Sequence, residues 1–500
     1  TMRRYFPEFD GFRSASRDAQ IIPVYRQLLA DRLTPVSAFQ VLGRDPNAFL
    51  LESVVGGEQV ARYSFIATSP SLIYQVAGGN ALIAHAGAGG AKEFTTSDPL
   101  ADLQRLLPHR RYHRDRRLPA FTGGLVGYAG YDTIRYYEAE KLPKPPRDDR
   151  RLPDLLFGLY GELVIFDHVD KTIKVVANAD LTLIPDLESA YRDACRRTDQ
   201  VVQRLQQPPM LSLGEIDATG TSSLTFESNF TREAFETAVR KGQEYIKAGD
   251  IFQFVPSQRL RLPSSAGPFD VYRALRVINP SPFMFYLKSV ACTLIGSSPE
   301  ILCRVADGKV TSRPLAGTRR RGATPEEDRA LEAELLADPK ERAEHIMLVD
   351  LHRNDVGRVA KVGSVRTSDV MAVERYSHVM HITTNVTGAL DDGMTALDAL
   401  RVSLPVGTVS GAPKIRAMQI IDELEPTRRG PYGGAVGYLD FAGNMDTCIA
   451  LRTIVWKNGT YDIQVGAGVV AESVAAAEYE ETMSKARAML KAVEVAQNGF

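Results

Sequence analysis

Hydrophobic residues follow two kinds of pattern along the chain. Short runs rich in β-branched and aromatic residues stand between glycine-rich turns, and longer stretches carry apolar residues three or four positions apart. The short runs predict strands and the longer stretches predict helices. Strands are expected at 48–54, 71–76, 123–128, 155–166, 283–288, 292–296, 435–440, 447–456 and 460–465. Helices are expected at 22–30, 99–107, 186–205, 231–246, 325–336, 340–352, 414–424 and 475–495. This mixture predicts an α+β protein.

A segment without periodicity separates the two halves of the chain. Residues 206–225 are rich in Pro, Gly, Ser and Thr, and they follow an expected helix. Such a composition is typical of a linker or a long surface connection. The sequence therefore predicts an N-terminal domain over residues 1–205 and a C-terminal domain over residues 226–500.

The composition narrows the class of protein. Of 500 residues, 44% are hydrophobic and 24% are charged, as in an ordinary globular protein. The net charge of -1 argues against a nucleic-acid binder. No apolar run approaches the roughly 18 residues that would cross a membrane. Four cysteines without a CxxC pair fit a reducing compartment, and the first residues lack the apolar core of a signal peptide. A cytoplasmic protein is expected.

Two expected helices each carry a pair of glutamates three positions apart. The pairs are Glu341 with Glu344 and Glu478 with Glu481, and residues at this spacing share one helix face. A single pair of this kind is usually part of a solvated surface. Two such pairs facing each other would form an all-oxygen site for a hard cation, for which Mg²⁺ is the natural occupant.

Two further segments carry candidate chemistry. The run Gly466-Ala467-Gly468 follows an expected strand, but the further strands that a dinucleotide-binding fold needs are missing after it. Its glycines instead leave backbone N–H groups open to a ligand carboxylate. Glu300 follows a Ser-Pro turn and precedes an apolar run, so partial desolvation would raise its pKa and suit a general acid. A turn-capping role is the alternative for this glutamate.

Seven motifs occur together in a defined order. They are Gly-Ser-Ser-Pro-Glu-Ile-Leu at 296–302, Pro-Leu-Ala-Gly-Thr-Arg at 314–319, Lys-Glu-Arg-Ala-Glu-His at 340–345, Arg-Asn-Asp-Val-Gly-Arg at 353–358, Gly-Thr-Val-Ser-Gly-Ala-Pro-Lys at 407–414, Gly-Ala-Gly at 466–468 and Glu-Tyr-Glu-Glu at 478–481. On these motifs the chain from about 226 to 491 resembles the chorismate-utilising enzymes. The resemblance implies an α/β sandwich of two interwoven domains, with large antiparallel sheets packed face to face and helices outside.

Within that family, the chain resembles the anthranilate synthase component I group. Ala316 stands where aminodeoxychorismate synthases carry a nucleophilic lysine, and Gln253 stands where members that add water carry a basic lysine. The resemblance implies an Mg²⁺-dependent lyase of tryptophan biosynthesis that converts chorismate and ammonia to anthranilate and pyruvate. Two alternatives stay open: an aminodeoxychorismate synthase that lacks the lysine, and a catalytically inactive paralogue that binds tryptophan.

The resemblance also implies roles for individual residues. Glu300 matches the acid that protonates the departing hydroxyl, His381 matches a histidine linked to pyruvate elimination, and Gln253 matches the position that selects ammonia over water. The implied metal ligands are Glu344 and Glu481 directly, with Glu341 and Glu478 acting through water. The implied substrate contacts are Gly317, Thr318, Thr408, Tyr432, Arg452, Gly466, Ala467, Gly468 and Lys485.

Regulation and partners follow from the same resemblance. Segments from both halves match a feedback site for tryptophan, with the candidate residues Glu52, Ser53, Pro282, Phe283, Met284 and Tyr438. The alternative is that these residues are ordinary interface core. None of the four cysteines lies in the G-x-C-x-G setting of a glutaminase. A separate glutamine amidotransferase subunit is therefore expected to supply ammonia in a hetero-oligomer.

Overall fold

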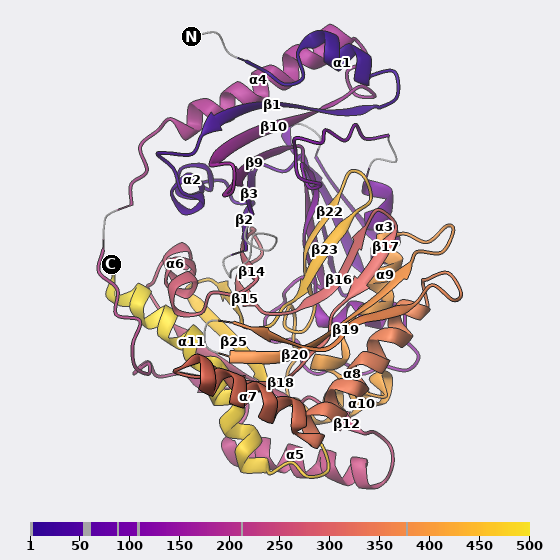
Figure 1. The fold of residues 1–500 in the computed structure, drawn as a ribbon, viewed down its shortest axis with the longest axis vertical. Coiled ribbons are helices and arrows are strands. Elements are labelled where there is room, and N and C mark those ends of the chain that lie inside the picture. Colours follow the sequence, from indigo (N-terminus) through magenta and orange to yellow (C-terminus); the bar gives the residue numbers. More distant parts are fainter. Residues whose placement is uncertain (1–3, 54–61, 88–89, 108–110, 212–213, 377–378) are drawn as a thin grey trace.

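The computed structural model describes residues 4–53, 62–87, 90–107, 111–211, 214–376 and 379–500. Over these residues the chain forms two large antiparallel sheets that face each other, with helices on their outer surfaces (Figure 1). The space between the sheets is filled by apolar side chains from both of them. No helix within these ranges is long and apolar enough to cross a membrane. The expected sandwich of antiparallel sheets and outer helices is confirmed.

The first sheet contains eleven strands in the described part of the chain. In spatial order they are β1 (Ile21–Leu29), β10 (Thr172–Asp180), β9 (Glu162–Asp167), β3 (Tyr63–Thr68), β2 (Ala48–Glu52), β14 (Phe283–Lys288), β15 (Thr293–Ser298), β24 (Thr453–Lys457), β25 (Thr460–Gly466), β13 (Ser257–Pro263) and β11 (Glu227–Ser228). Strands β2 and β14 join the two halves of the sequence, and Glu52 lies opposite Met284 in their register.

The second sheet contains twelve strands in the same described ranges. In spatial order they are β18 (Leu315–Arg320), β20 (Val379–Ala389), β17 (Lys309–Ser312), β16 (Ile301–Ala306), β23 (Met445–Ile449), β22 (Ala435–Asp440), β7 (Gly124–Ala129), β8 (Leu155–Tyr160), β4 (Leu72–Ala77), β5 (Asn80–His85) and β6 (Ala91–Thr95), while β19 (Arg366–Arg375) pairs with β20. A separate small ladder joins β12 (Gln253–Phe254) to β21 (Gly411–Ala412).

Both large sheets take strands from before and after residues 206–225. This segment therefore divides the sequence but does not divide the sheets. It is also anchored, because the backbone N–H and hydroxyl of Ser223 donate to Glu494 at 2.7 and 2.6 Å, and the N–H of Met210 donates to Gln40 at 2.7 Å. Residues 212–213 of the expected linker lie outside the described residues.

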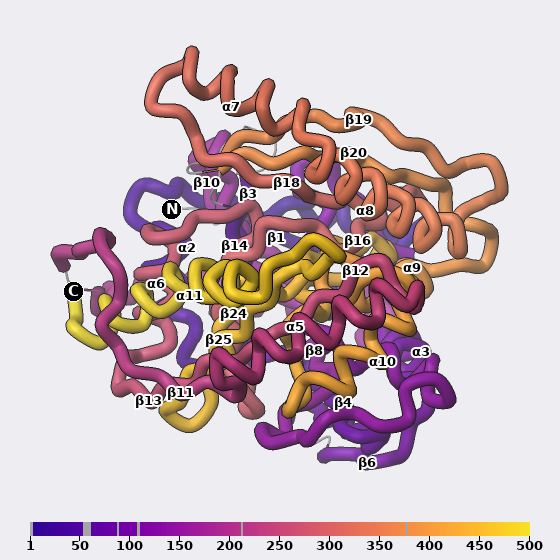
Figure 2. Tube along the Cα trace, turned by 90° about the horizontal axis from the view of Figure 1, so that it is seen from below, coloured from indigo at the N-terminus to yellow at the C-terminus, as the bar shows by residue number. Residues whose placement is uncertain are grey.

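Helices cover the outer faces of both sheets. They are α1 (Phe9–Ala15), α2 (Pro35–Leu42), α3 (Pro99–Leu106), α4 (Leu187–Leu205), α5 (Arg232–Lys247), α6 (Pro268–Ile278), α7 (Pro325–Ala337), α8 (Pro339–Gly357), α9 (Ala396–Ser403), α10 (Lys414–Leu424) and α11 (Ala475–Asn498). Helices α2, α4, α6 and α11 share a core with the first sheet, and α3, α8 and α9 share one with the second. Helix α11 lies alongside α5 (Figure 2), and both contribute to a smaller core with α10.

Three sequence expectations are wrong in detail. Residues 22–29 of the helix expected at 22–30 lie in strand β1, because the nearly continuous apolar run of this strand pairs with β10 along nine residues. Residues 155–166 and 447–456 were each expected as one strand, and each contains parts of two strands in different sheets. The apolar run continues through each change of sheet because the facing inner surfaces of both sheets are apolar, so periodicity alone does not mark the break.

The passages between the sheets position part of the site. The chain leaves the first sheet after β15 and enters the second at β16, with Pro299 and Glu300 between them. It returns between β23 and β24, where Arg452 lies. The two passages lie side by side, because the N–H of Ile449 donates to the carbonyl of Glu300 at 3.0 Å and the N–H of Ser297 donates to the carbonyl of Arg452 at 3.2 Å.

Candidate active site

Glu300 lies buried at the passage between the two sheets. Its side chain accepts hydrogen bonds from the Thr408 hydroxyl at 3.0 Å and from the Leu315 N–H at 3.4 Å. Burial raises the pKa of Glu300 to about 8, although both hydrogen bonds act in the opposite direction. The carboxyl is therefore largely protonated at neutral pH, as the sequence pattern predicted from its setting. Thr408, expected as a substrate contact, lies directly beside it.

His381 on β20 lies against the neighbouring strand β18. Its Nδ1 is 2.9 Å from the carbonyl of Gly317 and 3.2 Å from the Thr318 hydroxyl. A carbonyl only accepts, so Nδ1 carries the proton. Burial lowers the pKa of His381, which keeps the ring neutral at neutral pH and leaves Nε2 as a proton acceptor. The Tyr376 ring packs edge-on against this imidazole, with centroids 5.6 Å apart.

Two helices bring the candidate metal carboxylates toward each other. Glu344 on α8 accepts a hydrogen bond from the Gln253 amide at 3.3 Å. Burial raises the pKa of Glu344, and the charges of Glu341 and Glu481 raise it further. Burial likewise raises the pKa of Glu478 on α11, with a further contribution from Glu481. Carboxylates from α8 and α11 are thus close enough to repel one another.

Helix α8 begins where it does because of its cap. Asp338 accepts the N–H groups of Lys340 and Glu341, and Pro339 occupies the first turn, where its missing N–H costs nothing. This cap sets the rotation of the helix and so the direction in which Glu341 and Glu344 point. Arg319 adds a second constraint, because its guanidinium contacts Glu341 at 3.3 Å and Asp338 at 2.8 Å.

The fit of this site to a divalent cation rests on charge and donor type. The four carboxylates offer only oxygen donors, which suits Mg²⁺, and their mutual repulsion would be relieved by a cation. Among the described residues, no group of three or more His, Cys, Asp or Glu side chains is arranged to hold an ion by itself. Because Mg²⁺ usually takes one or two carboxylates and completes its shell with water and substrate oxygens, this does not conflict with the expected pair Glu344 and Glu481.

Glycines are required at positions 466 and 468, where the segment that is expected to contact the substrate packs against neighbouring side chains. A Cβ at Gly468 would lie 2.9 Å from the Gln253 amide nitrogen, and a Cβ at Gly466 would lie 2.9 Å from the Tyr432 hydroxyl. Any larger residue would displace these side chains. Between the two glycines, the backbone N–H of Ala467 already has a hydrogen-bond partner, because it donates to the carbonyl of Pro256 at 3.2 Å.

Two cations expected to face the substrate, Lys485 and Arg452, have protein partners. Lys485 pairs with Glu481 at 2.7 Å and donates to the Gly466 carbonyl at 2.9 Å. Arg452 has a left-handed backbone conformation, with φ of 45°, and donates to Asn279 at 3.4 Å. Its charge lowers the pKa of His381, which places both near one another. Tyr432 is buried, and burial raises the pKa of its hydroxyl to about 12.

Sequence reasoning missed two residues of this region. The sequence pattern predicts no role for Arg319, although this residue contacts a candidate metal carboxylate; its position directly after Gly317 and Thr318 is the signal that could have found it. Tyr376, which packs on His381, carries no sequence signal, because aromatic residues near strand ends are common in any sheet.

The six residues expected to bind tryptophan line one cavity between the two sheets. Its volume is about 540 Å³, and its lining includes Glu52, Ser53, Pro282, Phe283, Met284 and Tyr438. Glu52 accepts a hydrogen bond from Tyr272 at 2.6 Å and pairs with Arg276 at 2.7 Å. Within the described part of the chain, the buried Ser53 hydroxyl has no hydrogen-bond partner. The Tyr438 ring stacks on Phe121 at 4.0 Å.

A second, smaller cavity lies between that cavity and the region of Glu300. Its volume is about 230 Å³, and it shares Pro282, Phe283, Arg304 and Arg313 with the larger cavity. It also reaches Leu315, whose N–H donates to Glu300. The expected regulatory segment and the candidate acid are therefore separated by only a few shared side chains.

The chain is similar to known proteins over nearly its whole length. The family model described as chorismate binding enzyme matches residues 51–491, and the chain belongs to this family. It is 46% identical to anthranilate synthase component 1 of Acetivibrio thermocellus, covering 98% of this chain and 99% of that one. It is 48% identical to anthranilate synthase component 1 of Pseudomonas aeruginosa, covering 95% and 96%. The crystal structure of anthranilate synthase component I from Streptococcus pneumoniae superimposes with a TM-score of 0.76 at 38% identity, covering 86% and 92%.

Proposed function

We propose that this chain is the chorismate-converting component of an anthranilate synthase. One chorismate and one ammonia give one anthranilate, one pyruvate and one water. Ammonia adds at ring carbon C2, the C4 hydroxyl leaves as water, and pyruvate is then eliminated as the ring becomes aromatic. The full-length similarity to anthranilate synthase component 1 proteins supports this assignment.

The observation that carries the proposal is the burial of the Glu300 carboxyl between the two sheets. Departure of a hydroxyl from the ring requires a proton, because hydroxide is a poor leaving group. Burial raises the pKa of Glu300 to about 8, so this residue holds a proton at neutral pH and gives it to the leaving oxygen. Its hydrogen bond from Thr408 at 3.0 Å fixes the carboxyl and stabilises the carboxylate that forms.

Gln253 explains the choice of nucleophile. An amide does not take a proton from water, whereas ammonia attacks with the lone pair that it already carries. The Gln253 amide nitrogen donates to Glu344, and its oxygen is buried with no hydrogen-bond partner in the described residues. That oxygen is an acceptor for an N–H of the incoming ammonia.

His381 serves the second half of the reaction. Its neutral ring donates the Nδ1–H to the Gly317 carbonyl, so Nε2 accepts the ring proton that is lost when pyruvate leaves. Arg452 lies near this imidazole and supplies a permanent positive charge for a substrate carboxylate.

A divalent cation fits the carboxylate site. Glu344 and Glu481 would hold Mg²⁺, with Glu341 and Glu478 acting through water; the bound ion would neutralise a substrate carboxylate and act as a Lewis acid. Lys485 forms an ion pair with Glu481 at 2.7 Å, and Arg319 forms one with Glu341 at 3.3 Å. These pairs offset part of the negative charge of the four carboxylates. The enzyme is accordingly proposed to be an Mg²⁺-dependent lyase.

The ammonia is proposed to come from a glutamine amidotransferase subunit. Burial raises the pKa of all four thiols: Cys195 to about 11, Cys303 to about 12, and Cys292 and Cys448 also upward. Such thiols stay protonated and are poor nucleophiles at neutral pH. A second chain must then hydrolyse glutamine, which agrees with the name component 1 carried by the relatives.

Tryptophan is proposed to inhibit from the larger cavity. A volume of about 540 Å³ falls in the range of small-molecule sites. The Ser53 hydroxyl is an available hydrogen-bond partner, Glu52 offers a carboxylate to the ligand ammonium beside Arg276, and Pro282 with Met284 gives an apolar wall. Because β2, β14 and β22 all border the cavity, the ligand would favour one relative arrangement of the two sheets.

The test is a chorismate assay with ammonium and Mg²⁺, with and without EDTA, in which products are separated by chromatography. Ortho-aminobenzoate with loss of activity in EDTA is the expected result. Para-aminobenzoate would instead identify an aminodeoxychorismate synthase. No consumption of chorismate would identify an inactive paralogue.

A further inference from the structure

A buried ion pair contacts the segments that carry several candidate site residues. Glu425, which ends α10, and Arg429 contact each other at 2.5 Å, and both side chains are 2% exposed. Burial alone would lower the pKa of Arg429, but the charges of Glu425 and Tyr131 and the hydrogen bonds to Glu425 together keep this pKa above its ordinary value. A buried pair is weak evidence for stability, because desolvation cancels much of the attraction. The hydrogen bonds from the pair to other segments therefore indicate which parts of the chain the pair positions.

Those hydrogen bonds go to the backbones of two segments that carry candidate site residues. Arg429 donates to the carbonyl of Val409 at 2.6 Å and to the carbonyl of Val255 at 2.6 Å. Val409 follows Thr408, which donates to Glu300, and Val255 lies two residues after Gln253. One guanidinium thus ties together segments more than 150 positions apart in the sequence.

Glu425 completes the arrangement from the other side. It accepts the N–H of Ser257 at 2.7 Å and the Ser257 hydroxyl at 2.8 Å. Ser257 lies opposite Gly466 in the register of β13 and β25. The Arg429 guanidinium also lies over the rings of Tyr131 at 4.5 Å and Tyr432 at 5.7 Å. Every hydrogen bond from the pair to another segment therefore ends at, or next to, a segment with a candidate site residue.

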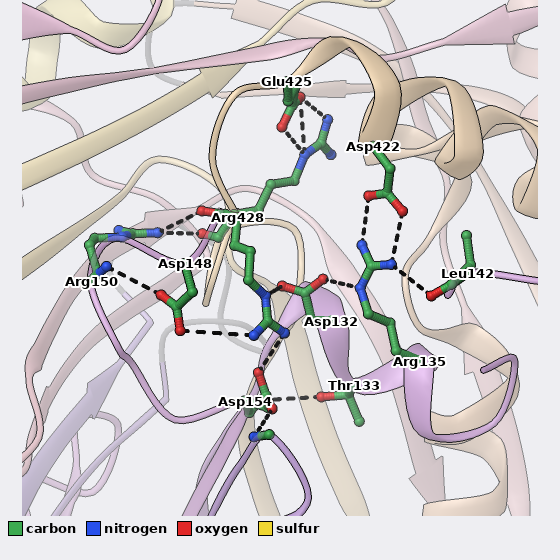
Figure 3. A network of polar contacts seen from close by, with 12 residues as sticks. Asp132, Thr133, Arg135, Leu142, Asp148, Arg150, Asp154, Asp422, Glu425 and Arg428 are labelled. Carbon is green, nitrogen blue, oxygen red and sulfur yellow. Dashed lines mark hydrogen bonds and ion pairs between the residues drawn. The ribbon is translucent and has the colours of Figure 1, made fainter. Parts of the chain in front are cut away.

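Further ion pairs surround this one without touching those segments. Figure 3 shows Arg135 between Asp132 and Asp422, with its guanidinium also donating to the carbonyl of Leu142. Arg428 joins Asp132 to Asp154 in the same network. These contacts connect the segment after β7 to α10 and to the residues that follow it, and they supply a matched comparison for Arg429.

We propose that Arg429 and Glu425 are positioning residues for the chorismate reaction, which hold the backbones of Gln253, Thr408 and Gly466 at the spacing that the substrate requires. The inference rests on the proposed function. Arginine is needed because its planar fork reaches the Glu425 carboxylate and two carbonyls at once, whereas lysine keeps the charge but not this geometry.

The test compares Arg429→Lys with Arg135→Lys, each of which retains a buried charge beside its carboxylate. Both variants should melt at lower temperature than the wild type. At a temperature where all three are folded, kcat/KM for chorismate with ammonium should fall at least tenfold in Arg429→Lys, or about 1.4 kcal/mol. It should fall less than twofold in Arg135→Lys. Equal losses in both variants would overturn the inference.

The pH profile separates positioning from a general loss of stability. The Thr408 hydrogen bond lowers the pKa of Glu300, so loosening the Val409 segment should move the alkaline limb of kcat to higher pH in Arg429→Lys. An unmoved limb would mean that the pair does not act through Thr408 and would overturn the proposed route. Arg135→Lys should leave the limb in place.

A milder variant covers the case in which Arg429→Lys fails to fold. Ser257→Ala removes the hydrogen bond from this hydroxyl to Glu425 and the one that it accepts from the Gln464 amide at 2.8 Å, while the strand pairing of β13 remains. It should lower kcat/KM at least threefold with a smaller fall in melting temperature than Arg429→Lys, and an unchanged kcat/KM would overturn the inference. Wild-type protein that forms no anthranilate would contradict the proposed function itself, which is a separate outcome.

Discussion

Replacing Glu300 by glutamine tests whether a buried, protonated carboxyl drives departure of the hydroxyl. The side chain is 2% exposed, and burial raises its pKa from 4.5 to about 8. At about 1.4 kcal/mol for each tenfold change, ionising Glu300 in the folded protein costs on the order of 5 kcal/mol more than in water. Glutamine keeps the size and a polar head group but has no proton to give.

The expected kinetic result has two parts. Because general acids typically contribute about 10²–10⁴-fold, Glu300→Gln should lower kcat by roughly a hundredfold or more. Wild-type kcat should also fall as the pH rises through about 8, since Glu300 then ionises. The residual activity of the variant should lack this alkaline limb. The assay is steady-state formation of anthranilate from chorismate and ammonium between pH 6 and pH 10.

Stability gives an independent measure of the same burial. The pKa of Glu300 is higher in the folded protein than in the unfolded chain. Protonation of Glu300 therefore contributes its full stabilisation below about pH 4.5, and this contribution is lost as the pH rises through about 8. Glutamine has no such dependence. Between pH 5 and pH 8, the free energy of unfolding should therefore shift in favour of the variant by on the order of 4 kcal/mol, as measured by urea titration.

Two results would refute this reasoning. A wild-type kcat that stays level to pH 9, or a variant that keeps more than a tenth of the activity, would exclude Glu300 as the acid. A difference in unfolding free energy that does not change with pH would show that burial does not shift the ionisation of Glu300.

The remaining predictions concern the metal, the nucleophile and regulation. Glu344→Gln and Glu481→Gln should each abolish turnover while the fold remains. Their stability without Mg²⁺ should equal or exceed that of the wild type, because repulsion between carboxylates is relieved. Both variants should lose the Mg²⁺-dependent rise in melting temperature, and normal activity in either would contradict the metal assignment. Gln253→Lys should form some isochorismate-type product, detectable by chromatography, because lysine deprotonates water; anthranilate alone at the wild-type rate would show that this position does not select the nucleophile. Ser53→Phe should fill the cavity between the sheets and relieve inhibition by tryptophan with little loss of catalysis, and equal inhibition of variant and wild type would place tryptophan elsewhere.

The sequence alone determined most elements and the candidate residue set. Helix α10 and strands β14 and β22 have the bounds that their apolar spacing predicts. These predictions are right because periodicity reports local backbone geometry and one-sided burial. The ordered motifs likewise identified the family to which the chain belongs. The roles of the individual site residues stay predictions.

Only the tertiary structure decided how those elements are assigned to sheets. Strands β8 and β9 follow each other with one residue between them, yet they belong to different sheets. Strand β1 has an apolar run that suits a helix equally well, and its pairing with β10 settles the matter. A linear pattern contains no information on which surface lies opposite, so changes of sheet are invisible to it.

The same limit applies to the chemistry of the site. The motif around Glu300 indicated desolvation, but the Thr408 and Leu315 contacts and the direction of each effect on its pKa depend on where distant segments meet. The contacts of Arg429 with Val255 and Val409 have no motif at all. Burial, charge and hydrogen bonding act through space, so residues far apart in the chain set one another's protonation and position only once the fold has brought them together.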